Sequence, residues 1–453
     1  MFHKILIANR GEIAVRIIRT CMYMGIETVA VYSTADKDSL HVQLADEAVC
    51  IGGPKSKDSY LNMENIISAA INTGAEAIHP GFGFLSENAD FAQLCEDCGI
   101  TFIGPKSEHI KAMGNKSWAR NKMKEINVPV VPGSEGEIEN IEDAIKLAKK
   151  IGYPVLVKAS AGGGGRGMRI ANDEETLKNA INTAKHEAIN AFGDGTLYLE
   201  KYVSNPRHIE FQVLCDKYGN ILHLHQRDCS IQRRNQKIIE EAPGIINHDL
   251  KERMVEASLK ACRAINYENA GTIEFLVSGE DFYFIEMNTR IQVEHPVTEM
   301  ITGKDIVKEQ IKIASGEKIS FNQDEVVING YSIECRINAE NPKHQFRPSP
   351  GKIKLMHIPS GNGIRFDSLI FPDCEIQPFY DSMIGKLIVY GENREEAVKK
   401  MRAALEELVI QGLDTNQNFL YMIINNPDYI KGNFDTSFIN SKLERLLEYD
   451  DNE

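Results

Sequence analysis

From residue 153 the sequence runs Tyr153-Pro154-Val155-Leu156-Val157-Lys158-Ala159-Ser160-Ala161-Gly162-Gly163-Gly164-Gly165-Arg166-Gly167, an apolar stretch that leads into a glycine-rich loop. Four consecutive glycines have no side chains and reach positive φ, so their N–H groups can close over a phosphate tail. Lys158 stands just before them and can reach the same phosphates as a point charge. The alternative is a hairpin tip without a function, for which four glycines are entropically costly. The segment therefore predicts a phosphate-binding loop.

Both flanks of this loop are strand patterns, Val155–Lys158 and Met168–Ala171. A Walker-type phosphate loop instead places Gly-Lys-Ser/Thr at the start of a helix, and neither feature is present. Helical patterns lie on either side, at Ile141–Ile151 and Glu174–Ala191. We therefore expect a small unit of helices and strands that carries its glycines at the tip of a hairpin.

Outward from this unit the chain divides into two kinds of pattern. Over the first hundred residues apolar runs alternate with helical patterns, which predicts a parallel α/β sheet. Its strands are Lys4–Ala8, Thr28–Tyr32 and Ala75–His79, and its helices Ile13–Met24 and Met63–Asn72. Beyond residue 203 longer strands are expected at His208–Cys215, Ile221–His225, Gly271–Val277 and Phe282–Asn288, with helices at Leu250–Ile265 and Lys304–Ala314. The strand-rich last third is expected to close with a helix over Arg394–Val409. The fold class is thus α/β and α+β.

Length and composition limit the kind of protein. A chain of 453 residues is too long for one ordinary core, so several domains are expected. The net charge of −14 argues against general nucleic-acid binding. We expect a cytoplasmic protein, because neither a membrane span nor a signal peptide is visible. Nine cysteines fit a reducing compartment, and Cys95-x-x-Cys98 is interpreted as a helix face rather than a zinc or redox pair.

A candidate metal site lies in the two strand patterns that surround Gly279-Glu280-Asp281. If this three-residue loop closes a hairpin that pairs Ser278 with Phe282, Glu274 faces Glu286 across the strands. Opposed like charges are destabilising, and a divalent cation would reverse that effect. Asn288 would share the same face and add an oxygen ligand of the kind that suits Mg²⁺ or Mn²⁺. The alternative is two solvated carboxylates on an edge hairpin, which conflicts with the apolar residues around them.

Polar residues continue at every second position after the hairpin, at Glu286, Asn288, Arg290, Gln292 and Glu294. If the segment stays extended, all five project from one face. Arginine offers a planar donor fork for a small oxyanion, glutamine adds donors, and glutamate can take a proton. We call residues 286–294 the polar strip and interpret it as the floor of a reactive pocket. A solvated amphipathic strand is the alternative.

These segments resemble the signature sequences of biotin carboxylases, which belong to the ATP-grasp superfamily. The resemblance covers nearly the whole chain and rests on Tyr153–Ser160 with the glycine loop, Phe284–Ile291, Lys4–Ile13, His79–Asn88, Arg227–Arg234 and Tyr380–Lys386. It implies an ATP-grasp fold in three parts: an N-terminal α/β domain over 1–113, an ATP-grasp region over 114–317 with a mobile lid at about 131–202, and a C-terminal domain over 318–447.

The resemblance also implies the reaction and the residues that perform it. Biotin on a carrier protein would be carboxylated with ATP, bicarbonate and two Mg²⁺ or Mn²⁺ ions, through carboxyphosphate. ATP would be bound by Lys116, Lys158, Gly164, Gly165, Glu200, Lys201, Tyr202, Val203, His208, Gln232, Asn235, Leu276, Glu274 and Glu286. Glu274, Glu286 and Asn288 would hold the metal, and Lys237, Arg290, Gln292, Val293 and Glu294 would bind bicarbonate. Arg336, Phe82 and Gly83 would bind biotin, with Lys237, Arg290, Glu294 and Arg336 catalytic.

Three positions depart from the family pattern. Asn235 stands where histidine is frequent, Phe82 replaces a common tyrosine, and Gln226 replaces a common glutamate. The first two put the nucleotide and biotin contacts in doubt. The family further implies a homodimer, with Arg16, Arg19 and Arg365 as candidate interface residues, although from sequence alone such arginines are usually surface residues.

The partners follow from the same resemblance. The sequence has no Met-Lys-Met biotin-attachment motif, so biotin is expected on a separate carrier, with carboxyltransferase subunits as further partners. The chain then resembles the carboxylase subunit of acetyl-CoA carboxylase, in malonyl-CoA and fatty acid synthesis. The same subunit of a pyruvate, propionyl-CoA or methylcrotonyl-CoA carboxylase remains open, and a carbamoyl-phosphate or amino-acid ligase is more distant. A nucleotide-sensing module without activity should lack Glu294, Arg290 or Lys237, and all three are present.

Overall fold

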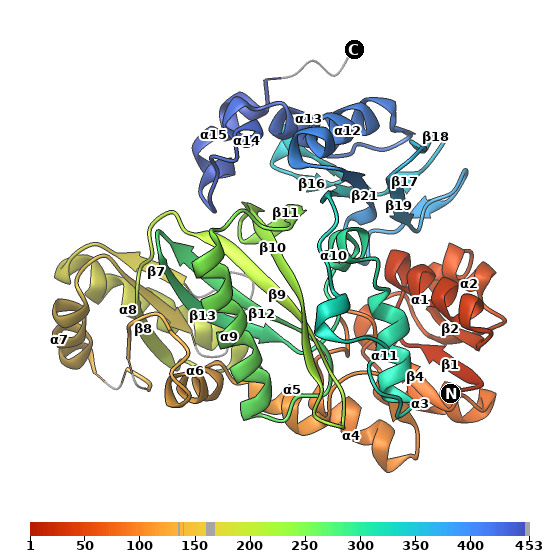
Figure 1. Cartoon of the computed structure of the whole chain (residues 1–453), viewed down its shortest axis with the longest axis horizontal. Helices are drawn as coiled ribbons and strands as arrows, with labels where there is room; N and C mark the ends of the chain where they lie inside the picture. Colours follow the sequence, from red (N-terminus) through yellow and green to blue (C-terminus); the bar gives the residue numbers. More distant parts are fainter. Residues whose placement is uncertain (135, 139, 160–167, 449–453) are drawn as a thin grey trace.

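The computed structural model describes residues 1–134, 136–138, 140–159 and 168–448. Figure 1 shows three parts around a central sheet: an N-terminal unit at the lower right, a lid at the left that carries α7 and α8, and a C-terminal part above. The expected ATP-grasp architecture, with a parallel N-terminal sheet and antiparallel strands beyond residue 203, is confirmed. No helix in the described ranges is long and apolar enough to cross a membrane.

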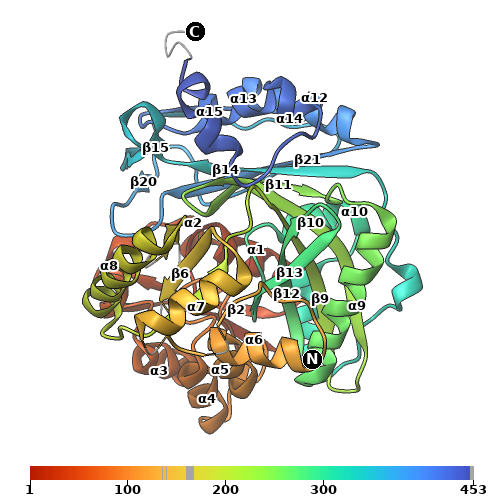
Figure 2. The ribbon, with the colours of Figure 1, turned by 90° about the vertical axis from the view of Figure 1, so that its left-hand side faces the viewer.

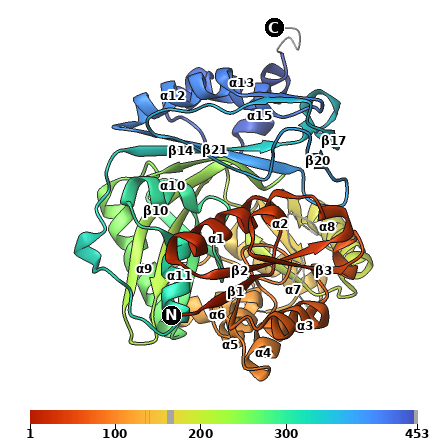
Figure 3. The same ribbon diagram turned by 90° about the vertical axis from the view of Figure 1, so that its right-hand side faces the viewer.

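The N-terminal unit is a five-stranded parallel sheet in the order β3-β2-β1-β4-β5 (Figure 3). Its strands are β1 (Lys4–Ile7), β2 (Glu27–Ser33), β3 (Glu47–Gly52), β4 (Ala77–His79) and β5 (Thr101–Phe102). Its helices are α1 (Gly11–Met24), α2 (Leu40–Leu44), α3 (Met63–Thr73), α4 (Ala89–Asp97), α5 (Ser107–Gly114) and α6 (Lys116–Glu125). Asparagine N-caps start α3, α4 and α6, and glycines at positive φ end α1 and α3.

The lid is a three-stranded antiparallel sheet in the order β7-β6-β8, covered by two helices (Figure 2). It comprises α7 (Ile141–Ile151), β6 (Val155–Ala159), β7 (Met168–Ala171), α8 (Glu174–Phe192) and β8 (Leu197–Lys201). The predicted strands on both sides of the glycine loop are therefore correct. The loop itself, with Gly164 and Gly165, lies outside the described residues.

The central sheet has eight strands in the order β13-β12-β9-β10-β11-β14-β21-β19, and it continues from the ATP-grasp region into the C-terminal part. The strands are β9 (Arg207–Cys215), β10 (Ile221–Arg233), β11 (Gln236–Ala242), β12 (Asn269–Ser278), β13 (Asp281–Asn288), β14 (Tyr331–Asn338), β19 (Ile364–Ser368) and β21 (Met383–Gly391). The helix α9 (His248–Ala264) packs on β9 and β10, and α10 (His295–Thr302) packs on β10, β11, β14 and β21. Nearby, α11 (Ile306–Ala314) contacts β12 and α1.

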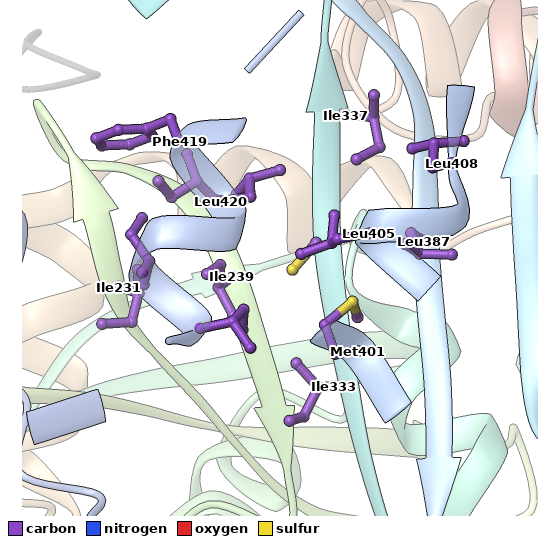
Figure 4. Close-up of a cluster of buried hydrophobic side chains, with 14 of the residues drawn as sticks. Ile231, Ile239, Ile333, Ile337, Leu387, Met401, Leu405, Leu408, Phe419 and Leu420 are labelled. Carbon is purple, nitrogen blue, oxygen red and sulfur yellow. The ribbon is translucent and has the colours of Figure 1, made fainter. Parts of the chain in front are cut away.

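Alternation along these strands separates an apolar face from a polar one. Ile239, Ile333, Ile337 and Leu387 pack against α12 (Arg394–Glu407) and α13 (Gln417–Ile424) in one buried cluster (Figure 4). The intervening residues of β11, β14 and β21, which include Glu240, Glu334, Arg336 and Lys386, therefore project from the opposite face.

The end of the chain differs from the prediction. The helix α12 stops at Glu407, because Val409 enters β22 (Val409–Gln411), and α13, α14 (Pro427–Ile430) and α15 (Phe438–Leu446) follow. A helix is thus present at the predicted place, but the prediction that it closes the chain and extends to Val409 was wrong. The remaining strands of this part are β15 (Glu340–Asn341), β16 (Arg347–Pro348), β17 (Gly351–Lys352), β18 (Leu355–His357) and β20 (Glu375–Ile376).

Candidate active site

One large cavity of about 1210 Å³ lies between the lid, the loops of the N-terminal unit and the central sheet. Every described residue that the sequence assigned to a ligand lines it. These residues are Phe82, Gly83, Lys116, Lys158, Glu200, Lys201, Tyr202, Val203, His208, Gln232, Asn235, Lys237, Glu274, Leu276, Glu286, Asn288, Arg290, Gln292, Val293, Glu294 and Arg336. Their individual roles stay predictions, but the structure brings all of them to one place.

The carboxylate hairpin has the predicted pairing but not the predicted turn. The turn has two residues, since Ser278 pairs with Asp281, and Gly279 adopts φ +62. The expected Ser278–Phe282 pair was therefore wrong. A register shift between Glu274 and Phe275 leaves one extra residue in β13 and restores the opposition of Glu274 and Glu286. The bulge thus places both carboxylates at the cavity.

Glu274 is compensated by hydrogen-bond donors of the protein itself, one of them the ammonium of Lys237. It accepts hydrogen bonds from Lys237 Nζ at 2.7 Å, Gln292 Nε2 at 2.7 Å and Asn288 Nδ2 at 2.8 Å, and His208 Nε2 lies 2.9 Å away. Burial would raise the pKa of Glu274, but Lys237 and His208 outweigh it and hold the pKa well below its usual value. The expected repulsion from Glu286 is therefore already offset without a metal.

Glu286 and Asn288 complete an oxygen-rich group that fits a hard cation. Glu286 is about one-third exposed to the cavity, and its Oε2 lies 3.6 Å from Lys116 Nζ. The Oδ1 of Asn288 accepts from Arg290 Nη2 at 3.0 Å. Carboxylate and amide oxygens on one face are the donors that Mg²⁺ takes alongside nucleotide phosphates.

The polar strip is not one extended strand. The strand β13 ends at Asn288, the backbone bends at Thr289 and Arg290, and α10 begins at His295 with Pro296 in its first turn. The prediction of period-2 alternation through residue 294 was wrong. The physical reason is that Glu87 of the N-terminal unit accepts the Thr289 N–H at 3.1 Å, which takes that amide out of the strand ladder. The polar side chains nevertheless converge on the cavity.

Lys237 connects the strip to the hairpin. Its Nζ lies 2.5 Å from Glu210 and 2.7 Å from both Glu274 and Glu294. Burial alone would lower the pKa of Lys237, but the three carboxylates raise it well above its usual value. Lys237 therefore stays charged at the centre of an acidic cluster.

Arg227 forms the buried base of this cluster and was not assigned a role from sequence. It is fully buried and donates to Glu210 at 2.5 Å, Gln212 at 2.9 Å and Gln292 Oε1 at 3.0 Å. Glu210 was missed as well. The available signal was period-2 spacing along β9, because His208, Glu210 and Gln212 alternate with apolar residues.

Glu87 is a further missed residue, which orients Arg290. Its Oε2 accepts from Arg290 Nε at 2.8 Å while its Oε1 takes the neighbouring Thr289 amide. One carboxylate of the N-terminal unit therefore fixes both the side chain of Arg290 and the backbone before it.

Glu294 lies between two cations at the start of α10. Its Oε1 accepts from Lys237 at 2.7 Å and its Oε2 from Arg336 Nη2 at 2.9 Å, and the residue is 1% exposed. Burial would raise the pKa of Glu294, but Lys237, Arg336 and Arg227 hold it below its usual value. Arg336 also contacts Glu240 Oε1 through Nε at 2.6 Å.

The lid side of the cavity carries its own ion pairs. Lys158 donates to Glu200, whose other oxygen lies 3.7 Å from Arg120 Nε. Lys201 donates to the backbone carbonyls of Gly152 and Tyr153, both at 2.9 Å. In the central sheet the side-chain amide of Gln232 contacts His208 Nδ1 at 2.7 Å.

The structure accounts for two of the three departures. Arg234 and Asn235 form the two-residue turn between β10 and β11, with φ of +50 and +63, and asparagine tolerates this conformation well. Gln226 is 4% exposed and donates to Gly244 O at 3.0 Å, which an ionised glutamate could not do. Phe82 lines the cavity, and its backbone carbonyl accepts from Asn9.

The three candidate interface arginines differ in exposure. Arg19 is exposed, whereas Arg16 is buried and lies 2.9 Å from both Glu299 and Asp305. Arg365 contacts the other oxygen of Glu299 at 2.8 Å. The expectation from sequence alone that all three lie at the surface was wrong for Arg16, because carboxylates of α10 and its neighbourhood compensate its burial.

Comparisons with known proteins agree along the whole chain. Three family descriptions match: "Biotin carboxylase, N-terminal domain" over residues 1–110, "Carbamoyl-phosphate synthase L chain, ATP binding domain" over 115–322, and "Biotin carboxylase C-terminal domain" over 334–441. Biotin carboxylase 1 of Bacillus subtilis is 56% identical over 442 residues, 97% of this chain and 98% of that protein. A pyruvate carboxylase component of Methanothermobacter thermautotrophicus is 53% identical over 440 residues, 97% of this chain and 90% of that protein.

A solved structure gives the same result. The biotin carboxylase domain dimer of Hydrogenobacter thermophilus 2-oxoglutarate carboxylase, in complex with MgADP, ADP and bicarbonate, has a TM-score of 0.95 and 52% identity, with 100% of both chains covered. Identity of this extent, together with a cavity lined by the family's expected residues, leaves one assignment. The chain belongs to the biotin carboxylase family of ATP-grasp enzymes.

Proposed function

We propose that the chain is the biotin carboxylase component of an acetyl-CoA carboxylase, and that it carboxylates the biotin of a separate carrier protein with ATP and bicarbonate. The observation that carries this proposal is Lys237, whose ammonium joins Glu274 of the hairpin to Glu294 of the strip. Nucleotide chemistry and bicarbonate chemistry then share one charged centre.

The nucleotide would lie between the lid and the hairpin. Phosphates would compete with Glu200 for Lys158 and with Glu286 for Lys116, since both lysines already face the cavity in ion pairs. His208, Gln232, Asn235, Lys201, Tyr202, Val203 and Leu276 would surround the rest of ATP, with Gly164 and Gly165 over the phosphates. Glu274, Glu286 and Asn288 would hold Mg²⁺ or Mn²⁺, which when bound neutralises phosphate charge.

Bicarbonate would bind between Lys237 and Arg290, beside Gln292 and the backbone of Val293. An anion there takes part of the positive charge that lowers the pKa of Glu294, which makes Glu294 a better proton acceptor. Glu294 would remove the bicarbonate proton, and the freed oxygen would attack the γ-phosphorus as ADP leaves.

Carboxyphosphate then breaks at its carbon–oxygen bond into CO₂ and phosphate, and the phosphate takes the proton from the ureido nitrogen of biotin. Arg336 would stabilise the negative oxygen of the resulting enolate, and the nitrogen attacks CO₂. Arg336, Phe82 and Gly83 line the same cavity as the bicarbonate residues, which supports a transfer within one site.

Partners and location belong to the same proposal. We expect a biotin carrier protein, carboxyltransferase subunits, a homodimer and a cytoplasmic location. The biotin carboxylase component of a pyruvate carboxylase is the second candidate, because a pyruvate carboxylase component matches this chain at 53% identity. The acyl acceptor depends on the carboxyltransferase partner in both cases.

The test measures ATP hydrolysis and carboxylation of biotin and of a carrier protein by the purified chain. Turnover should require bicarbonate, rise with biotin and be strongest with the carrier. Lys237→Gln should lose nearly all activity, whereas Lys217→Gln, an exposed lysine outside the cavity, should keep it. An ATP turnover rate that depends on neither bicarbonate nor biotin would overturn the proposal. Adding a carboxyltransferase for acetyl-CoA or one for pyruvate would distinguish the two candidate functions.

A further inference from the structure

Two glutamates on the polar face of the central sheet oppose each other, and only one of them, Glu240, contacts a cation. Glu240 of β11 pairs directly with Glu334 of β14, and both side chains are 0% exposed. Directly opposed side chains have Cβ atoms about 5 Å apart, so the two carboxyl groups are within reach of each other. Neither residue belongs to the proposed reaction.

Their hydrogen bonding is unequal. The Oε1 of Glu240 accepts from Arg336 Nε at 2.6 Å, and Arg336 Nη2 lies 2.5 Å from the same atom. The Oε2 of Glu240 and both oxygens of Glu334 are buried and have no hydrogen-bond partner among the described residues. Lys386, on the neighbouring strand, instead donates to Val293 O at 2.8 Å and lies 3.3 Å from Glu12.

A fully buried carboxylate without a donor is too costly to keep ionised. Two adjacent carboxyl groups in that situation share a proton, because both cannot be charged at such a separation. Burial also raises the pKa of Glu240, to about 7, although Arg336 opposes that rise. Glu334, which has no hydrogen-bond partner among the described residues, is therefore the natural proton carrier of the two. Burial raises the pKa of Glu334 well above its usual value, which is consistent with this assignment.

We propose that Glu240 and Glu334 are an acid pair that holds one proton, in which the O–H of Glu334 faces Oε2 of Glu240, and that this proton keeps Arg336 available for biotin. The inference rests on the proposed function of Arg336. Both glutamates are positioning residues, since neither lines the cavity.

The charge balance on Arg336 gives the reason. Arg336 has two anionic partners, Glu240 and Glu294, and neither contact uses its Nη1 atom. When Glu294 accepts the bicarbonate proton it becomes neutral, and Glu240 is then the single anion that still contacts Arg336. The guanidinium of Arg336 can then bind the negative oxygen of biotin. An ionised Glu334, two residues from Arg336 on the same face, would instead pull the guanidinium back toward the sheet.

The main groups that act on the pair do not include the residues assigned to the metal, Glu274, Glu286 and Asn288. The titratable or charged side chains that surround it are Arg336 on β14, Lys237 on β11, Lys386 on β21, Glu294 and His295 at the start of α10, and Glu12 on α1 beyond Lys386. Burial keeps His295 neutral, since it lowers the pKa of that residue well below its usual value. Loss of the shared proton at alkaline pH is therefore the change that should weaken biotin carboxylation.

The first experiment is infrared spectroscopy of the full chain and of Glu334→Gln at neutral pH. The parent should show a protonated carboxyl band that the variant lacks. Identical carboxylic-acid bands would overturn the proposal. This readout needs no activity, so it decides the acid pair even if the chain fails to carboxylate biotin, in which case the proposed function fails separately.

The second experiment compares biotin-dependent carboxylation with bicarbonate-dependent ATP hydrolysis in the absence of biotin. Glu240→Gln should lower the first rate about ten-fold or more and the second less than about three-fold, because Arg336 acts on biotin. Glu241→Gln is the matched control. Glu241 accepts hydrogen bonds from Arg394 and Tyr331 and does not line the cavity, so this variant should leave the ratio of the two rates unchanged. An equal fall of both rates in Glu240→Gln would overturn the proposal.

The pH profile supplies a third readout. With rising pH the ratio of carboxylation to ATP hydrolysis should fall in the parent and stay level in Glu334→Gln, whose amide has no proton to lose. Superimposed profiles would contradict the acid pair.

Discussion

At the scale of single residues, the site works because carboxylates are placed where cations would otherwise repel one another. Lys237, Arg227 and Arg336 lie within one buried cluster, and each contacts Glu210, Glu240 or Glu294. Removing one partner of such a cluster leaves an uncompensated buried charge, which costs more than the pair contributes. This explains how a protein with a net charge of −14 holds three buried cations in one cluster.

Glu87 should affect bicarbonate more than ATP. Its carboxylate fixes Arg290 Nε at 2.8 Å and is 39% exposed, so a modest effect is expected. Glu87→Gln should raise the KM for bicarbonate about five-fold, or ~1 kcal/mol, and leave the KM for ATP nearly unchanged. Glu64→Gln, an exposed glutamate on α3, is the control. An ATP KM that rises as much as the bicarbonate KM would show a general distortion instead.

The asparagine at position 235, where histidine is frequent in the family, should be compatible with ATP binding. It is exposed at positive φ in a turn, where an asparagine side chain still offers a donor and an acceptor. Asn235→His should change the KM for ATP by less than about ten-fold, or ~1.4 kcal/mol. Steady-state kinetics at saturating bicarbonate checks this, and a larger change would mean that the nucleotide site depends on asparagine.

At the scale of elements, sequence patterns located most of the fold and the site. The helix Ile141–Ile151 and the strand Met168–Ala171 have the predicted bounds, because an asparagine N-cap and a glycine loop mark their ends. The hairpin register was right only because a bulge compensated for a wrong turn length, and bulges have no local signature in these residues. The course of the strip after Asn288 depends on Glu87, about 200 residues away, so periodicity could not reveal it.

The hairpin should be needed for metal-dependent turnover and not for stability. Glu274 is held by Lys237 and His208, and Glu286 lies 3.6 Å from Lys116, so the two carboxylates do not depend on a metal to coexist. Glu286→Gln should lower turnover at least about ten-fold and shift the Mg²⁺ requirement upward. The metal-free protein should keep its unfolding free energy within about 1 kcal/mol. Normal turnover over a Mg²⁺ series would contradict the metal assignment.

The base of the lid should tolerate no side chain at Gly133. This residue bridges to Glu200, and an added Cβ would lie 2.2 Å from the carbonyl oxygen of Leu199. Gly133→Ala should therefore displace β8, which carries Glu200 and Lys201, and raise the KM for ATP about ten-fold. Gly136→Ala is the matched control, because nothing lies within 4 Å of its added Cβ. Hydrogen exchange of β8 should increase in the first variant alone, and equal exchange in both would refute the steric argument.

At the scale of the whole molecule, ion pairs tie the N-terminal unit to the rest of the chain. Arg16 of α1 and Arg365 of β19 contact the two oxygens of Glu299 on α10, and Arg365 also holds Asp367 through Nη2 at 2.6 Å. All of these side chains are largely buried, so the contacts are little screened by solvent. The cavity lies where these parts meet, and its shape therefore depends on this connection.

Asp367 should make this connection sensitive to acid. Burial would raise the pKa of Asp367, but Arg365 outweighs it and lowers the pKa to about 2. A carboxyl group whose folded pKa is depressed contributes stability above its unfolded pKa of about 3.9, and this contribution is lost as pH falls toward the folded value. The free energy of unfolding of Asp367→Asn should therefore be about 2 kcal/mol lower than that of the parent at neutral pH. This difference should stay constant down to about pH 5. Below about pH 4 the difference should shrink, because the parent protonates the same group. Urea unfolding of both proteins over this pH range measures the difference directly, and a difference that grows as pH falls would show that Arg365 does not stabilise the ionised form.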